Sequence, residues 1–373
     1  MAPQCCTFER ERSSLLWQDA TMHTDVIADL TAWTGNEVAA DRSWEFHLSD
    51  AEVSALERAL RTVADRPLVE IGAQDFVIDD LAPTLDAIRH QLRAGRGFAV
   101  LKGFPVDQPL PDLERLYWGL LAHVGNGVTQ NSDASLIHYV TDGRLRPNQG
   151  GRGVGNPGKS GLHVDLADYV SLLCVRQAKD NPPSWLGSAT FAHNHLLEHE
   201  PELLEVLYRG FEWDRLGEEG SHDGPTTGYR VPVFSAAEGL VSCRYNRFWM
   251  AAAVKRSGGG WSTEERAALD ALDAVLHANR LDVDFVEGDI QFVNNYVVLH
   301  GRDAHALEDD EDHKRLLMRI WVNDDEQPRP VADEAVVRHG VLRHGNLGWK
   351  LPEVRAGLVG TARTRRSDGA VLV

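Results

Sequence analysis

The distribution of β-prone segments along the chain is the feature that most restricts its fold. Predicted helices lie before the strands and between groups of strands, and helices and strands do not alternate regularly. A doubly wound sheet requires regular alternation, so the pattern argues against that fold. It favours an α+β domain whose second half is a β-sandwich or jelly roll, flanked by helices.

Local signals predict the individual elements. Two capping boxes, Ser49 with Glu52 and Ser262 with Glu265, mark the first turns of helices. Pro111 opens a helix that ends at Gly125, and Pro201 breaks a helical stretch from about 191 to 209. Strands are predicted at 97–101, 163–177, 229–234, 240–245, 283–286, 290–293, 296–299 and 316–322.

The chain is interpreted as one domain with two extensions. Residues 1–45 show weak periodicity and form an N-terminal extension, residues 46–323 form the jelly-roll domain, and residues 324–373 form a C-terminal extension. Within the domain, residues 143–161 are dense in Gly, Pro, Asn and Arg, and this composition predicts a long loop that acts as a lid.

Charge and hydropathy exclude several classes of partner. The 373 residues carry a formal net charge of −18, which repels phosphate backbones and anionic lipids, so nucleic acid is not an expected partner. The apolar runs are much shorter than the roughly 20 residues of a membrane span, and no signal peptide is evident, so the chain is expected in the cytoplasm. The four cysteines are expected to be free thiols, and a homo-oligomer is compatible with the sequence.

Two motifs suggest chemistry that their context does not support. Residues 153–160 match the phosphate-binding loop pattern, but that loop needs a buried strand before it and a helix after it, and here a polar run precedes it and a strand follows. His195, Glu198 and His199 have the spacing of an inverted zinc-peptidase motif. Pro201 ends any helix that carries them directly after His199, so a zinc peptidase remains only an alternative.

The pattern His-x-Asp occurs twice, at His23 and at His163. On a strand, residues two apart point to one side, so His163 and Asp165 can face the same ion. A strand from Tyr296 then leads into His300, which supplies a third ligand. Two histidines and one carboxylate leave three coordination positions open, as suits non-haem Fe(II) in oxygenases, whereas His23 is assigned a structural role.

Arg315 and Arg319 follow His300 on the next predicted strand. Because they are four residues apart, both side chains face one way on an extended strand. Burying two guanidinium groups is costly unless they meet anions, and a planar guanidinium binds a carboxylate through two hydrogen bonds. A dicarboxylate cosubstrate would supply such a group. Solvated arginines on an edge strand are the alternative.

From about Gly95 to Asn323 the chain resembles the taurine and chlorophenoxyacetate dioxygenase (TauD/TfdA-like) family, in the clavaminate-synthase-like group. The order and spacing of several segments carry the resemblance. These segments are 97–103, 163–174, 187–190, 244–246, 288–290, 294–295, 300–302 and 315–319.

The resemblance implies a double-stranded β-helix with Fe(II) on His163, Asp165 and His300. It implies that Thr190 and Arg315 bind the distal carboxylate of 2-oxoglutarate, and that Arg319 meets an anionic group of the substrate. Arg302 is a second candidate for binding that anionic group. Val164 stands where the family commonly has Thr, and residues 181–185 replace a turn that often contains Gly-Gly.

The expected activity is that of an Fe(II)- and 2-oxoglutarate-dependent oxygenase. It would use O2 to hydroxylate an unactivated C–H bond of a small anionic or amino-acid-like molecule, releasing succinate and CO2. A β-sandwich binding protein without turnover is the other alternative, besides the zinc peptidase.

Overall fold

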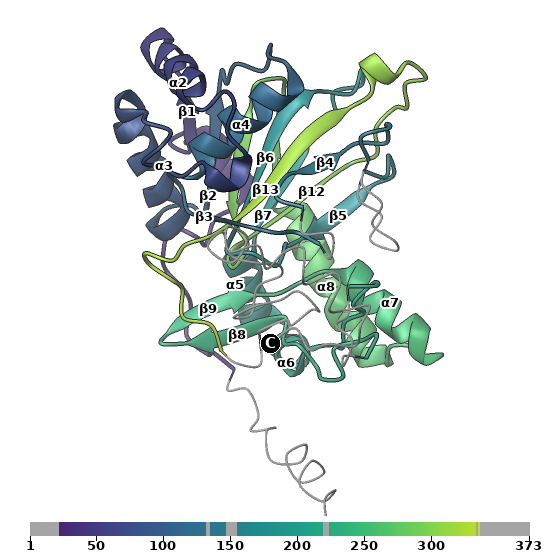
Figure 1. The fold of residues 1–373 in the computed structure, drawn as a ribbon. Coiled ribbons are helices and arrows are strands. Elements are labelled where there is room, and N and C mark those ends of the chain that lie inside the picture. The colour runs from purple at the N-terminus through teal and green to yellow at the C-terminus, as the bar shows by residue number, and fades with distance from the viewer. Residues whose placement is uncertain (1–21, 132–134, 147–154, 219–223, 333–334, 336–373) are drawn as a thin grey trace, which may run out of the picture.

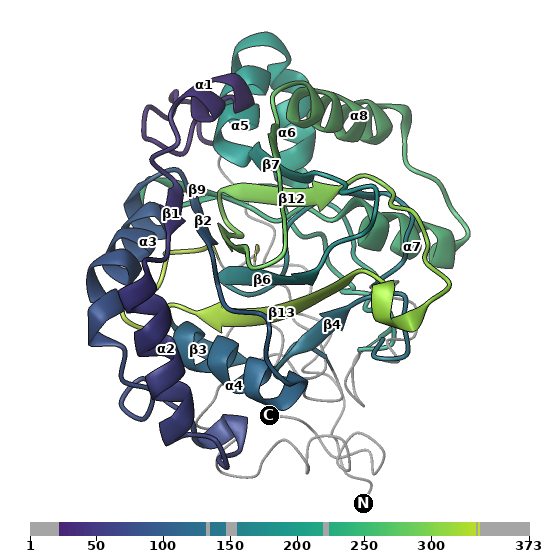
Figure 2. The same ribbon diagram turned by 90° about the horizontal axis from the view of Figure 1, so that it is seen from above.

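A computed structural model describes residues 22–131, 135–146, 155–218, 224–332 and 335. Its centre is a pair of β-sheets that face each other, with helices on the outer side of each sheet (Figures 1 and 2). The α+β jelly roll expected from the sequence is thus confirmed.

The larger sheet has the strand order β1-β2-β11-β6-β13-β3, and β4 also pairs with β13. The smaller sheet has the order β10-β7-β12-β5, and β8 pairs with β9 as a separate hairpin. The strands are β1 (Glu45–His47), β2 (Phe98–Lys102), β3 (Asn126–Val128), β4 (His138–Val140), β5 (Ser160–His163), β6 (Tyr169–Arg176), β7 (Ser184–Ser188), β8 (Phe234–Ala237), β9 (Leu240–Cys243), β10 (Leu281–Val283), β11 (Ile290–Asn294), β12 (Val298–Arg302) and β13 (Leu316–Asn323).

The helices divide between the two sheets. The helices α2, α3 and α4 cover the larger sheet, and α5, α6 and α8 lie beside the smaller one (Figure 2). Their bounds are α1 (Gly35–Ala40), α2 (Asp50–Thr62), α3 (Ala82–Ala94), α4 (Leu110–Leu121), α5 (Ala189–His199), α6 (Pro201–Arg209), α7 (Arg247–Ser257) and α8 (Thr263–Ala278).

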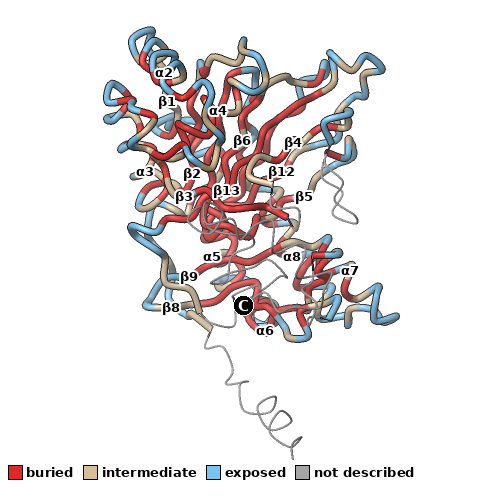
Figure 3. The backbone as a smooth tube through the Cα atoms, in the orientation of Figure 1, coloured by how far each residue is buried: buried red, intermediate tan, exposed pale blue. Residues whose placement is uncertain are grey.

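Two apolar clusters stabilise these layers. One joins the inner faces of the two sheets to α5, α6 and α8, and the other packs α2, α3 and α4 against the outer face of the larger sheet. The central strands are therefore buried on both sides, as Figure 3 shows for β6 and β13. Polar side chains that face the space between the sheets lie in a largely dehydrated environment, which fixes them in position and strengthens their electrostatic interactions.

Several predicted elements are confirmed and others are corrected. The capping boxes at Ser49 and Ser262 open α2 and α8, and Pro201 separates α5 from α6. The strand expected at 229–234 is wrong, because β8 begins only at Phe234. The single strand expected at 163–177 is also wrong, because β5 ends at His163 and β6 begins at Tyr169, so Asp165 lies between two strands. Three helices, α1, α3 and α7, were not anticipated. Cys174 and Cys243 are buried free thiols, as expected.

Residues 22–45 pack on the domain. The backbone of Ile27 exchanges two hydrogen bonds with the side chain of Asn194 on α5 (3.0 and 2.7 Å), and the Thr31 hydroxyl lies 2.9 Å from that of Thr190. In the described part of the chain no helix combines the length and the apolar character that crossing a membrane requires.

His193 on α5 predicts sensitivity to acid. Burial lowers its pKa to about 4, and its Nε2 lies 2.9 Å from the hydroxyl of Tyr208. Because the pKa of the folded protein lies below the unfolded value of 6.5, protonation favours the unfolded chain, and stability is lost as pH falls from 6.5 towards 4. We expect this loss to be roughly 3 kcal/mol, measured by urea unfolding across that range.

The variant His193→Leu should make this acid limb less steep, leaving the contribution of the buried His300, whereas His199→Gln, at an exposed position of the same helix, should leave the limb unchanged. Equal acid limbs in wild type and His193→Leu would contradict the assignment.

Candidate metal centre

Three side chains meet between the sheets where β5 and β12 run side by side. His163 is the last residue of β5, and the backbone pairing places it directly opposite His300 on β12. Asp165 follows two residues later. Gly301 lets the strands approach this closely, because a Cβ atom there would lie 2.8 Å from the Ser160 carbonyl oxygen. The three residues predicted as metal ligands are thus brought together.

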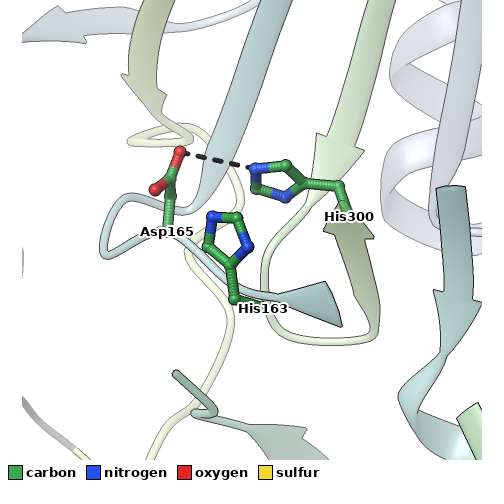
Figure 4. Close-up of side chains that lie close together, drawn as sticks. All are labelled: His163, Asp165 and His300. Carbon is green, nitrogen blue, oxygen red and sulfur yellow. Dashed lines mark ion pairs between the residues drawn. The ribbon is translucent and has the colours of Figure 1, made fainter. Parts of the chain in front are cut away.

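Their geometry fits one metal ion. One ligand atom from each of the three lies within 4.8 Å of the others, and they are the only such group of three or more in the described residues. The rings of His163 and His300 are 4.5 Å apart at their centroids, and His300 Nε2 is 3.8 Å from Asp165 Oδ2 (Figure 4). Two imidazoles and one carboxylate leave three positions of an octahedral ion open.

Both imidazoles are prepared to act as ligands. His163 Nδ1 lies 2.8 Å from the Gly161 carbonyl oxygen, so it carries the proton and leaves Nε2 as the free electron-pair donor. Burial lowers the pKa of His300 to about 3, with His163 acting in the same direction and Asp165 opposing it. His300 is therefore neutral at physiological pH, as metal binding requires.

Asp165 is held by side chains of β13. Trp321 Nε1 donates to Asp165 Oδ2 at 2.9 Å, and Arg319 Nη1 lies 3.3 and 3.2 Å from the two carboxylate oxygens. Burial would raise the pKa of Asp165, but Arg319, the two histidines and Trp321 outweigh it and hold the pKa below its usual range. The carboxylate therefore stays ionised, and the motif search did not anticipate Trp321 as its partner.

Arg319 is 6% exposed and has an incomplete set of partners. Its Nε donates to the side chain of Gln130 at 2.8 Å, and that side chain also donates to the Arg319 carbonyl oxygen. Its Nη2 is buried without a hydrogen-bond partner. Burial lowers the pKa of Arg319, and Asp165 opposes the shift. A second anion beside Asp165 would complete its hydrogen bonds.

Arg315 lies just before β13, toward the end of the sandwich at which β12 ends. It is 5% exposed, and its Nε donates to the Gln177 side chain at 2.8 Å. No described residue accepts a hydrogen bond from its two terminal nitrogens. Burial lowers its pKa to about 10, with Arg302 contributing, so it remains a cation at neutral pH. The sequence-based expectation that both arginines face the interior agrees with this arrangement.

Arg302, expected at the substrate, instead contacts the loop before β5. Its guanidinium donates to the carbonyl oxygens of Asn156 and Gly158, the latter at 2.9 Å, and the backbone N–H of His305 donates to the Pro157 carbonyl at 3.0 Å. These bonds tie the described end of the expected lid to β12. Residues 147–154 of that lid lie outside the described residues.

We expect Arg302→Ala to accelerate backbone amide exchange in residues 155–160. Two lost hydrogen bonds of about 1 kcal/mol each should raise the rate roughly 10- to 100-fold, as measured by hydrogen exchange with mass spectrometry. Arg230→Ala is the control, because Arg230 bonds the Gly210 carbonyl far from this loop. Unchanged exchange in Arg302→Ala would contradict the anchoring role.

Thr190 is not brought to Arg315. It lies in the first turn of α5, beyond the β7 residue that pairs with Val298 at the start of β12. Ser184, at the other end of β7, pairs with Arg302, and Arg302 is the electrostatic neighbour of Arg315. The Ser184 hydroxyl is buried and donates to Gln291 on the opposing sheet at 2.8 Å. The unusual segment 181–185 was the sequence signal for this position.

The competing motifs do not form sites in the described residues. The described part of the phosphate-loop pattern, 155–160, runs into β5 instead of a helix. His195 and His199 lie on α5, which ends at His199, and their rings stack 4.4 Å apart. Neither belongs to a group of three ligands. His23 lies near His193, with 6.1 Å between the ring centroids.

A jelly roll with two histidines and one carboxylate between its sheets defines the class of non-haem iron oxygenases. Residues 64–321 match the family described as "Taurine catabolism dioxygenase TauD, TfdA family". The chain belongs to this family, and it is an Fe(II)- and 2-oxoglutarate-dependent dioxygenase.

Known proteins resemble the chain over most of its length. "FR-33289 synthase" of Streptomyces rubellomurinus (strain ATCC 31215) is 27% identical over 80% of this chain and 90% of that protein. "Taurine hydroxylase-like protein SAT17" of Stachybotrys chartarum (strain CBS 109288 / IBT 7711) is 26% identical over 80% of each.

Solved structures share the fold. An asparagine oxygenase with Fe(II), 2S,3S-3-hydroxyasparagine and succinate has a TM-score of 0.59 and 16% identity, covering 75% of this chain and 93% of that chain. The non-haem iron oxygenase OrfP with Fe, succinate and (3S)-hydroxy-L-Arg has a TM-score of 0.56 and 17% identity, covering 75% and 94%.

Proposed function

We propose that this enzyme hydroxylates an unactivated C–H bond of a small anionic or amino-acid-like substrate and releases succinate and CO2. The observation that carries the substrate class is Arg319, which is fully enclosed beside Asp165 with Nη2 buried and unpaired. An unsatisfied guanidinium donor in a dehydrated site favours a carboxylate or a similar anion. The solved relatives that hold hydroxylated arginine and asparagine are consistent with an amino acid.

In this proposal His163, Asp165 and His300 hold the iron, which, with 2-oxoglutarate and O2, supplies the oxidising power for C–H cleavage. Arg315 binds the distal carboxylate of 2-oxoglutarate, since its terminal nitrogens have no described protein acceptor and its charge is buried. Ser184 takes the role expected of Thr190 and donates its hydroxyl to the same carboxylate. It is buried at the end of β7 and β12 where Arg315 lies.

The side chains at the site also limit which reaction it favours and how the substrate is oriented. Asp165 is a carboxylate ligand, whereas Ala or Gly there would open a coordination position for a halide, so the site favours hydroxylation over halogenation. Arg302 holds the loop from 156 to 158 against β12. Arg319 orients the substrate by its anionic group, and the position of that group decides which carbon faces the metal.

The function is tested by aerobic release of succinate from 2-oxoglutarate and Fe(II) with a panel of amino and other carboxylic acids. The enzyme should form metal-dependent succinate that a substrate stimulates, and His163→Ala should not. A protein that binds a ligand without turnover would give none with any acid. Zinc retained through purification together with peptidase activity would favour the His195 and His199 alternative.

Substrate class is tested separately by equilibrium binding without oxygen. Candidate acids should bind wild type, with metal and 2-oxoglutarate present, more tightly than they bind Arg319→Ala. Equal affinity would contradict an anion-binding role for Arg319.

A further inference from the structure

The carboxylate of Asp165 accepts a hydrogen bond from a neutral donor that no motif assigns. Trp321 Nε1 lies 2.9 Å from Asp165 Oδ2, and both residues are buried, at 1% and 7% exposure. The indole N–H is a donor only, so it can neither bind the metal nor exchange a proton with the carboxylate. Its contribution must be made through the position and charge distribution of Asp165.

The indole is held by Arg319 on β13 and by the apolar cluster between the sheets. Trp321 and Arg319 are two residues apart on β13, so both side chains project from the same face toward Asp165. The Arg319 guanidinium lies over the Trp321 ring, 4.7 Å from its centroid, and Trp321 is part of the apolar cluster between the sheets. The indole N–H therefore has a fixed direction toward Asp165. A mobile donor would not fix the orientation of the carboxylate.

Asp165 lies in the segment that follows β5. Strand pairing therefore does not fix its side chain, and contacts from other elements must do so. Its backbone N–H donates to the Asn295 side chain at 3.0 Å, and the Asn295 amide donates to the Ala167 carbonyl at 3.0 Å. These two bonds fix the backbone of the ligand, but they leave the carboxylate free to rotate about its side-chain bonds. Trp321 and Arg319 are the groups that limit this rotation.

The geometry points to Trp321 as a positioning residue that sets how Asp165 presents its oxygens to the metal. By holding Oδ2, the indole N–H would keep the carboxylate in one orientation before the metal arrives and would favour binding of the ion through one oxygen. A carboxylate bound through both would occupy one of the three open positions that a chelating cosubstrate and O2 require. This inference rests on the proposed metal ligands and adds a determinant of their geometry.

The test compares two tryptophan-to-phenylalanine variants in metal-binding titrations without 2-oxoglutarate or substrate. Trp321→Phe keeps an aromatic ring and removes the N–H. Trp44→Phe is the matched control, because Trp44 is also buried and its indole donates at 2.8 Å to the Val38 carbonyl, remote from the metal ligands. Mn²⁺ affinity is measured by the loss of the electron paramagnetic resonance signal of free Mn²⁺ on binding. The geometry of the ligands is measured by the visible absorption spectrum of bound Co²⁺.

We expect Trp321→Phe to weaken Mn²⁺ binding roughly 10- to 100-fold, as is typical for loss of a hydrogen-bond partner of a metal ligand, and to change the Co²⁺ spectrum. Trp44→Phe should change neither. Wild-type affinity and spectrum in Trp321→Phe would overturn the inference. If this variant does not fold, benzothienylalanine at position 321, which has the shape of tryptophan without the N–H, provides the same comparison.

The assignment of the three metal ligands and the role of Trp321 are tested by different outcomes. Wild type that binds no metal, or binds it as tightly as His163→Ala does, would refute the metal ligands themselves. Wild type that loses metal with His163→Ala, but not with the tryptophan replacements, would refute only the role of Trp321.

Discussion

Replacing Asp165 with alanine is expected to lower the free energy of unfolding of the metal-free enzyme by about 3–5 kcal/mol. Arg319 is the reason, because its guanidinium is buried against Asp165 and would be left as an uncompensated charge. Gln130 would remain as a neutral partner only. Urea unfolding measures the loss, and metal binding, assayed in the same samples, should also disappear.

A second substitution distinguishes the buried charge from a general packing defect. The double variant Asp165→Ala, Arg319→Met removes both charges, and we expect it to recover most of the lost stability. Asp80→Ala is the surface control, because the Arg58–Asp80 pair is about half exposed and its loss should cost less than about 1 kcal/mol. A double variant as unstable as Asp165→Ala would show that Arg319 is not the cause.

The sequence predicts those elements whose signal is local. The capping boxes of α2 and α8 consist of two residues three apart, and both open helices where expected. The same signal was present for α1, where Thr34 and Glu37 form a capping box. The missed helix α3 begins at Ala82 without a side-chain cap, but Pro83 in its first turn is the same start signal that Pro111 gives for α4.

The three expected metal ligands come together, although the strand argument holds only in part, because β5 ends at His163 and Asp165 lies in the segment between β5 and β6. His163 and Asp165 are close in sequence, and His300 needed only a strand that pairs with β5. The partners of Asp165 could not be predicted in the same way. Trp321 and Gln130 reach the site through the pairing of β13 with other strands and through side-chain packing, which a motif search does not include.

The site assignment of Thr190 shows a different limit. The expectation located Thr190 by its spacing in the family pattern, and residues 181–185 differ from the turn that is common there. The structure places Thr190 on α5, where its hydroxyl meets Thr31, and leaves Ser184 on the inner face of β7. The structure shows that the Ser184 hydroxyl, and not that of Thr190, lies at the end of β7 that pairs with Arg302, which spacing in the sequence could not show.

Replacing Arg315 with methionine is expected to raise the concentration of 2-oxoglutarate needed for half-maximal succinate formation by roughly 10- to 150-fold. Loss of hydrogen bonds between a guanidinium and a carboxylate accounts for about 1.5–3 kcal/mol, and each 1.4 kcal/mol corresponds to a factor of ten. Methionine retains the apolar stem of the arginine, so packing around position 315 should be little affected.

The control for Arg315→Met is Arg329→Met, which removes a partly buried arginine. Arg329 Nε donates to the Ser242 hydroxyl at 2.9 Å and Nη2 donates to the Val241 carbonyl at 2.8 Å, so its loss should affect stability and leave the requirement for 2-oxoglutarate unchanged. Arg315→Lys should have an intermediate effect, because an ammonium keeps the charge and loses the paired hydrogen bonds. If Arg315→Met and Arg315→Lys both had the 2-oxoglutarate KM of the wild type, the carboxylate would have to bind elsewhere, and the buried charge of Arg315 would require another anion.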